Sequence, residues 1–306
     1  MNSAMPKMAW MNCASSTAAT RSTDFPLLPQ DGDVLEGVPA RVRCTKRQSC
    51  VRGILALALI ALLTPARLVL AGPAAERDFA AAARKAFQQA KAQSQSEPTN
   101  AQAGWQLGRA CFDLAEFATN NAQRAELAQA GISACQRALA QASNSAPAHY
   151  YLGLNLGQLA RTKSLGALKL VSQMEAEWNI ARALDERLDY GGPDRSLGLL
   201  YRDAPTIVSI GSRTKAREHL RRATDLASEY PENRLNLIET ELKWGNRKEA
   251  LRDLKSLEEA LSAVRKSFPA ADWAASWTDW EKRLQKLRKT LEEPSKVLES
   301  PRAKGG

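Results

Sequence analysis

A short phrase recurs along this chain at a fixed interval, and this repetition constrains the fold more than any other feature of the sequence. Residues 103–108 read Ala-Gly-Trp-Gln-Leu-Gly, and residues 148–153 read Ala-His-Tyr-Tyr-Leu-Gly. Leu197-Gly198 falls in the same place once more, so the three Leu-Gly pairs stand 45 residues apart. A fixed period of this length is typical of stacked supersecondary units rather than of one globular core.

A second pattern follows each Leu-Gly pair and predicts a second helix in every unit. A small residue is followed four positions later by a larger one, and three positions after that by another small or apolar residue. Its copies are Gly131, Cys135 and Ala138; Ala176, Ile180 and Ala183; Ala216, Leu220 and Ala223; and Ala250, Leu254 and Leu257. Small residues at these places let paired helices approach closely, so the sequence predicts an all-α chain of helical hairpins.

These features resemble the tetratricopeptide repeat, whose pattern is an aromatic residue, then Leu-Gly, then Ala-x3-Phe-x2-Ala, then proline. Prolines stand just before each predicted first helix, where a missing N–H costs little: Pro98, Pro147, Pro193 and Pro231. The resemblance implies an all-α, tetratricopeptide-type helical-hairpin solenoid with about four repeats over residues 98–268. The first two units exceed the usual period of about 34 residues. We therefore expect lengthened helices, or a projecting loop, around residues 114–128 and 160–174.

Both ends of the repeat array carry apolar patterns of their own. Residues 72–97 predict an N-terminal cap helix with Phe79 and Phe87 on one face. Residues 269–293 predict a C-terminal capping helix with a single apolar stripe, formed by Trp273, Trp277, Trp280, Leu284, Leu287 and Leu291. The alternative for this stripe is a coiled-coil seam that dimerises the protein. The polar residues 294–306 predict a disordered tail.

Residues 51–71 have the features of a secretory signal peptide. An apolar run over residues 53–63 follows Arg52, and small residues suited to a signal peptidase end at Ala71. We predict cleavage after Ala71 and a soluble, periplasmic or otherwise exported protein, because no lipidation cysteine follows the run. The alternative is an N-terminal membrane anchor, for which the run is short. Residues 1–50 are polar and unpatterned, and are read as a disordered extension or a mis-called start.

Little in the sequence supports catalysis or cofactor binding. His149 and His219 fall in different repeats, and neither has a second His or Cys at metal-ligand spacing. No nucleophile elbow, phosphate-binding loop or dinucleotide fingerprint is present. Residues 72–306 carry a net charge of +6 without a long run of like charges, which excludes a nucleic-acid arm. The sequence therefore predicts no enzyme, no metal and no cofactor.

Two cysteines, Cys111 and Cys135, follow the proposed cleavage site, one on each predicted helix of the first hairpin. In an oxidising compartment the pair can form a disulfide across the hairpin. The alternative is that both are small buried apolar residues.

A binding groove is the remaining candidate site. Tetratricopeptide stacks curve, and the first helix of each unit lines the concave face. The residues expected there are Trp105, Arg109 and Phe112 in the first unit, Tyr150, Tyr151 and Leu154 in the second, and Arg195, Leu199 and Arg202 in the third. Aromatic residues interleaved with arginines suit an extended apolar ligand ending in a carboxylate, or an acidic peptide tail. The alternative for Trp105 and Tyr150 is that they pack between neighbouring helices.

Residues 146–233 carry a more specific resemblance. Tyr150-Tyr151-Leu152-Gly153, Tyr190-Gly191-Gly192-Pro193, Leu197-Gly198-Leu199-Leu200-Tyr201 and Tyr230-Pro231-Glu232-Asn233 resemble the tetratricopeptide (T) component of tripartite ATP-independent periplasmic transporters. This resemblance implies an all-helical periplasmic protein that holds a small organic anion or docks a substrate-binding protein of the transporter.

Two functions are therefore expected from the sequence. The first is a non-enzymatic exported adaptor whose repeat surface binds another protein. The second is an accessory component of a periplasmic transport system that binds a small amphipathic organic anion.

Overall fold

The computed structural model of this protein describes residues 73–163, 166–207, 209–270 and 272–292, with side chains from Phe79 onward. The predicted extension (1–50), signal peptide (51–71) and tail (294–306) lie outside the described residues. In the described part the chain forms ten helices and no strand. None of these helices is long and apolar enough to cross a lipid bilayer.

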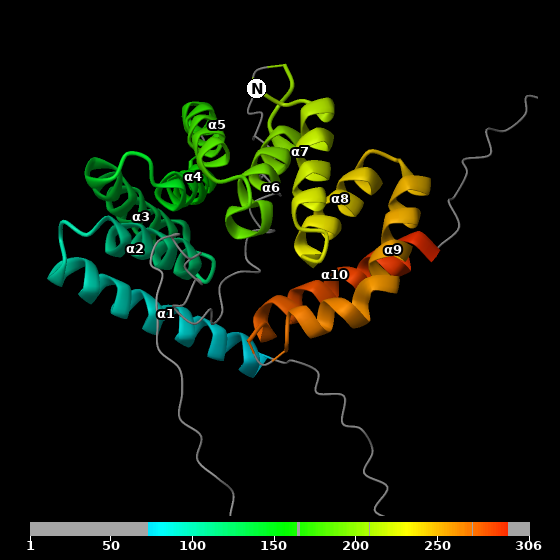
Figure 1. The fold of residues 1–306 in the computed structure, drawn as a ribbon, viewed down its shortest axis with the longest axis horizontal. Helices are drawn as coiled ribbons and strands as arrows, with labels where there is room; N and C mark the ends of the chain where they lie inside the picture. Colours follow the sequence, from blue (N-terminus) through cyan, green and yellow to red (C-terminus); the bar gives the residue numbers. More distant parts are fainter. Residues whose placement is uncertain (1–72, 164–165, 208, 271, 293–306) are drawn as a thin grey trace, which may run out of the picture. The chain divides into compact units, whose positions relative to one another are not determined.

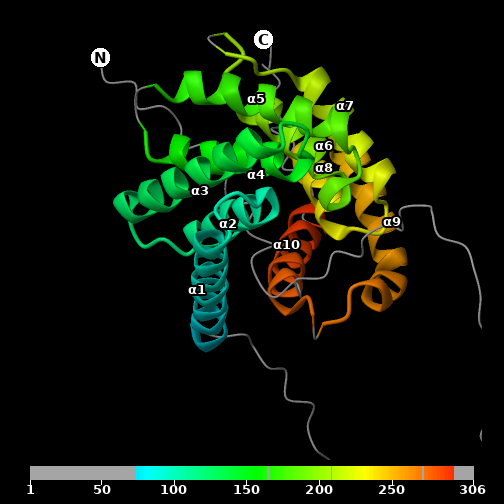
Figure 2. The same cartoon turned by 60° about the vertical axis from the view of Figure 1, so that its left-hand side comes forward.

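The helices follow one another as antiparallel hairpins along the chain (Figure 1). Their bounds are α1 (Pro73–Ser96), α2 (Ala101–Ala115), α3 (Asn121–Gln141), α4 (Ala146–Arg161), α5 (Ala167–Leu184), α6 (Leu188–Asp203), α7 (Arg213–Leu226), α8 (Pro231–Lys243), α9 (Arg247–Ser267) and α10 (Ala274–Glu292). Pairs α2–α3, α4–α5, α6–α7 and α8–α9 form the hairpins, and each second helix also packs on the next first helix. Figure 2 shows the same succession from a second side. The fold is an all-α solenoid of helical hairpins, as the repeat predicts.

The glycine of each Leu-Gly pair is required because the second helix of the same hairpin packs directly on it. A Cβ atom at Gly108 would lie 2.2 Å from Sγ of Cys135, and one at Gly198 would lie 2.7 Å from Cγ of Leu220. At Gly153 the added atom would lie 2.3 Å from Nε1 of Trp178. The absence of a side chain therefore sets the close approach of the two helices in each hairpin.

The register predicted for the second helix of the second unit is wrong by two residues. The buried face of α5 is formed by Met174, Trp178 and Ala181, whereas Ile180 is 42% exposed. The 45-residue period holds for the first helices but not for α5. The rotation of α5 instead follows its tertiary contacts, in which Trp178 packs against Gly153 and donates to the carbonyl of Tyr150.

The extra residues of the first two units lengthen their second helices. Helix α3 has 21 residues and α5 has 18, whereas the first helices α2 and α4 have 15 and 16. In the third unit, by contrast, residues 204–207 and 209–212, between α6 and α7, are not helical.

Helices α1 and α10 cover the two ends of the stack. α1 packs on α2, and α10 packs on α8 and α9. The α10 stripe is buried against this chain, with Trp280 fully inaccessible and Leu284 and Leu287 at 3% exposure. The helix is therefore a cap rather than a dimer seam. Trp273 lies just before α10 instead of in it, and packs beside Tyr230 and Phe268.

Candidate functional site

The structure does not bring the nine predicted groove residues together as one exposed surface. Six of them are buried, at 3–8% exposure: Phe112, Tyr150, Tyr151, Leu154, Arg195 and Leu199. The prediction that these six line an open groove is therefore wrong. The first helices of the inner units are packed on nearly all sides, and α4 alone buries 13 of its 16 residues.

Arg195 lies in a buried polar network that we call the inter-repeat clamp, formed by Tyr150, Asp189, Arg195 and Asn233. The Nη2 atom of Arg195 lies 2.6 Å from Oδ2 of Asp189, and its Nη1 atom donates to Oδ1 of Asn233 at 3.0 Å. The Tyr150 hydroxyl donates to the same Asp189 oxygen at 2.9 Å. These four residues come from α4, α6 and α8, so the clamp joins three successive repeats.

The clamp also supports an unfavourable backbone turn. Asp189, Tyr190 and Gly191 have φ values of 51°, 57° and 74°. This is the left-handed region, which residues other than glycine rarely adopt. Arg195 donates to the carbonyl of Asp189 at 3.1 Å, and Asn233 donates to the carbonyl of Tyr190 at 2.8 Å. This turn, at the start of α6, is therefore held by Arg195 of the same repeat and by Asn233 of the following repeat.

The charges in the clamp compensate one another. Burial by itself lowers the pKa of Arg195, but Tyr150 and Asp189 outweigh it and the pKa is raised. Burial, followed by the Asp189 charge, raises the pKa of the Tyr150 hydroxyl well above its ordinary value. Arg195 is thus a charged guanidinium whose fork is already filled, which makes it a structural residue and not an open anion site.

Trp105 and Arg109 on α2 remain partly exposed. The Trp105 ring stacks on Tyr151, with centroids 5.9 Å apart and planes 4° from parallel. Arg109 lies 3.6 Å from the Asp113 carboxylate one turn later. Trp105 therefore packs between neighbouring helices, which was the alternative expected for it. Tyr150 also packs between helices, as part of the clamp.

Arg202 is also paired within the fold. Its Nε and Nη2 atoms lie 2.9 and 2.6 Å from the two carboxylate oxygens of Asp203, and its Nη1 atom lies 3.3 Å from the Thr240 hydroxyl on α8. The predicted arginines of the third unit thus connect the third repeat to the fourth.

Cys111 and Cys135 are free, buried thiols. Burial, followed by the nearby Asp113 carboxylate, raises the pKa of Cys111 to about 12, and burial likewise raises that of Cys135. The structure has the second of the two alternatives, in which both residues pack as small apolar groups. The disulfide is not formed.

Both histidines pair with carboxylates on a neighbouring helix. Nδ1 of His149 lies 2.6 Å from Glu177, and Nδ1 of His219 lies 2.7 Å from Asp194. No cluster of three or more His, Cys, Asp or Glu side chains suited to a metal occurs among the residues that the structure describes.

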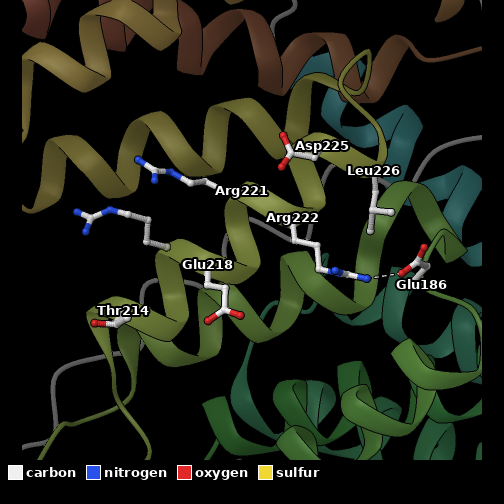
Figure 3. Close-up of a pocket in the computed structure, with 8 residues that line it drawn as sticks. Glu186, Thr214, Glu218, Arg221, Arg222, Asp225 and Leu226 are labelled. Atoms are coloured by element: carbon white, nitrogen blue, oxygen red, sulfur yellow. Dashed lines mark hydrogen bonds and ion pairs between the residues drawn. The ribbon is translucent and has the colours of Figure 1, made fainter.

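The side of α7 that lines a hollow was not among the sites predicted from the sequence. Glu186 and seven residues of α7 line an open hollow of about 670 Å³, which includes Arg217, Arg221 and Arg222. Figure 3 shows Arg222 directed at Glu186, with which it forms an ion pair, and Arg221 directed away from that pair. The available signal was the four-residue spacing of Arg213, Arg217 and Arg221, which places three guanidiniums on one side of a helix.

The comparisons with known proteins agree with this fold. A family model described as "Regulator of microtubule dynamics protein 1-3" matches residues 74–187, which span α1 to α5. The crystal structure of a thermophilic TPR protein from Thermus thermophilus is similar with a TM-score of 0.50 and 17% identity, over 69% of this chain and 95% of that one. No curated protein matches the chain. The protein thus has a tetratricopeptide-type fold.

Proposed function

We propose that this protein is a non-enzymatic adaptor that binds another polypeptide through its repeat surface. The observation that carries the proposal is the stack itself, in which four helical hairpins are closed by cap helices α1 and α10. Such stacks present extended surfaces because each unit contacts only its neighbours. Because one fold hosts many functions, the proposal depends on finding the partner.

The geometry favours a polypeptide over a small organic anion. A small organic anion was expected to bind Arg195 and Arg202, but both guanidiniums form ion pairs with carboxylates of the fold. An anion bound there would compete with the buried carboxylates of Asp189 and Asp203 for these guanidiniums, which is costly. The resemblance of residues 146–233 to the T component still supports the second candidate, an accessory role in a periplasmic transport system. That candidate needs a site other than the clamp.

Export belongs to the same proposal. Cleavage after Ala71 would leave a chain that begins just before α1, which starts at Pro73. The N-terminal mass of the protein isolated from its source cells tests this step. A chain that retains residues 1–71 in the membrane fraction would support an anchor instead.

The adaptor is tested by native mass spectrometry of the full chain, expressed with a C-terminal tag in source cells and purified without denaturant. A polypeptide that co-purifies in a fixed ratio, and is absent from a preparation of the tag alone, is the expected result. A discrete small-molecule adduct on a protein without partner would favour the transport accessory. A bare monomer would count against both.

A further inference from the structure

A stripe of arginines runs along one side of α7. Arg213, Arg217 and Arg221 are spaced four residues apart, so their side chains lie on the same side of the helix. The whole helix contains five Arg and Lys residues and only two acidic residues, Glu218 and Asp225. This gives α7 a net charge of +3 over 14 residues, whereas α9 carries +2 over 21 residues.

Trp244, at the C-terminal end of α8, lies beneath this stripe. The guanidinium carbons of Arg213 and Arg217 are 5.7 and 5.1 Å from the centroid of its ring. Both distances lie within the range of cation–π contacts. The indole therefore holds two arginine side chains in place, which reduces the conformational entropy lost when they bind a ligand.

The charges of the stripe are only partly compensated. Arg217 forms two bonds to the buried Glu241, at 2.7 and 3.0 Å. In the part of the chain that the structure describes, neither Arg213 nor Arg221 has a carboxylate within ion-pair distance. Both side chains belong to exposed residues. Arg213 and Arg221 can therefore form ion pairs with carboxylates of a ligand.

We propose that the surface formed by Arg213, Arg217, Arg221 and Trp244 binds an acidic segment of the partner protein. The inference rests on the proposed adaptor function and names the place and chemistry of the contact. Arg213 and Arg221 are about 12 Å apart along the helix axis, which an extended segment spans with about four residues. Carboxylates on such a segment reach both guanidiniums, and an apolar or aromatic residue between them packs beside the indole.

The test uses the full-length protein with ¹⁵N-labelled tryptophan and a short oligoglutamate peptide as the probe. The indole signal of Trp244 is assigned with Trp244→Phe. We expect the peptide to shift this signal, and expect binding to weaken when NaCl rises from about 0.05 to about 0.5 M. Replacing Arg213 and Arg221 by Glu should weaken binding about tenfold or more.

The matched control replaces Arg84 and Lys85 by Glu; both are exposed residues of the N-terminal cap helix α1. This variant has the same change in net charge and should bind the peptide as the parent does. Equal losses in both variants, or a Trp244 signal that does not move, would overturn the inference. Unchanged circular dichroism of each variant verifies the fold.

The two proposals fail in different ways. If the parent protein captures a polypeptide in source cells and the Arg213→Glu/Arg221→Glu variant captures it equally, the α7 surface is not the contact but the adaptor function stands. If the parent captures none, the adaptor function itself fails. If capture is lost in the variant alone, and the partner's contact segment is acidic, both hold.

Discussion

At the scale of single residues, Arg195 illustrates how a side chain that looks suited to a ligand can belong to the scaffold. It occupies the same place in its repeat as Tyr150 does 45 residues earlier, and its Nη2 atom lies 3.3 Å from that hydroxyl. Asn233 takes the corresponding place in the next repeat and accepts from Arg195. Three different residue types at one repeat position thus form a continuous polar connection.

Arg195→Ala is expected to lower the free energy of unfolding by about 3–5 kcal/mol, because it removes the guanidinium that pairs with the buried Asp189 carboxylate. Urea unfolding followed by circular dichroism measures the change. Arg84→Ala, on an exposed position of α1, is the control and should stay within about 0.5 kcal/mol. An Arg195 variant as stable as this control would contradict the structural role of the clamp.

Glu116 gives a prediction for pH dependence. Its side chain is 6% exposed, and burial raises its pKa above the ordinary value of 4.5 although Arg161 and Gln158 oppose this shift. Because the pKa is higher in the folded state, Glu116 contributes stability below pH 4.5 that is lost as pH rises through the folded-state pKa.

Glu116→Gln removes this titration. The stability of the parent relative to the variant should therefore increase as pH falls from about 7.5 to about 5. Urea unfolding of both proteins at each pH measures the difference. A difference that is constant with pH, or that changes in the opposite direction, would show that the Arg161 charge outweighs burial.

Native Cys111 and Cys135 should resist alkylation, because only the thiolate reacts and burial raises both pKa values. Iodoacetamide treatment followed by peptide mapping is the measurement. Both sites should be modified after denaturation in guanidinium chloride without reductant. A denatured protein that is modified only after reduction would instead contain the disulfide.

At the scale of helices, the glycine of each Leu-Gly pair decides how closely a hairpin closes. Helix propensity alone favours alanine over glycine by about 1 kcal/mol. At Gly153 sterics oppose this, because the added Cβ would overlap the Trp178 indole. Gly153→Ala should therefore destabilise the protein by about 1–3 kcal/mol.

A double-mutant cycle with Trp178→Leu separates the two effects in this hairpin. With the indole removed, the alanine should cost less than it does in the parent, which gives a favourable coupling energy. Additive costs would mean that the glycine is needed for its backbone and not for the close approach.

The helical hairpins and both caps could be predicted from periodicity, because helix spacing is a local property of the chain. The rotation of α5 could not. Trp178 does not fit a small-large-small pattern copied from the first unit. Tertiary contacts position it, namely the packing against Gly153 and the hydrogen bond from its indole to the carbonyl of Tyr150. The period of the first two units likewise allowed either lengthened helices or a projecting loop, and the structure has long second helices, α3 and α5.

At the scale of the whole molecule, stability is transmitted from repeat to repeat, so the ends need covering. α10 seals the last hairpin through Trp280, whose indole N–H donates to Glu232 at 3.0 Å, and through Arg283, which binds Glu232 and Glu239. Tyr230 and Phe268 pack against the same indole.

A chain that ends at Phe268 should therefore expose the aromatic cluster, bind ANS and unfold at lower urea concentration than the parent. Trp280→Ala should reproduce part of the loss, about 3–5 kcal/mol, whereas Lys282→Ala on the exposed side of α10 should not. A truncated chain with parental stability would mean that α10 is not the cap.

The spacing of apolar and small residues along the chain is enough to predict the class of fold, the pairing of helices and the places of the caps. It did not determine which polar side chains are free. Arg195 and Arg202 are residues of a type suited to a ligand site, yet both are paired within the fold. Arg195 binds Asp189, 6 residues away, and Asn233, 38 residues away. Arg202 binds Asp203, the next residue, and Thr240, 38 residues away. The carboxylates of Asp189 and Asp203 are local, but only the stacking of repeats buries these ion pairs and brings Asn233 and Thr240 beside them. The same packing left Arg213 exposed beside Trp244.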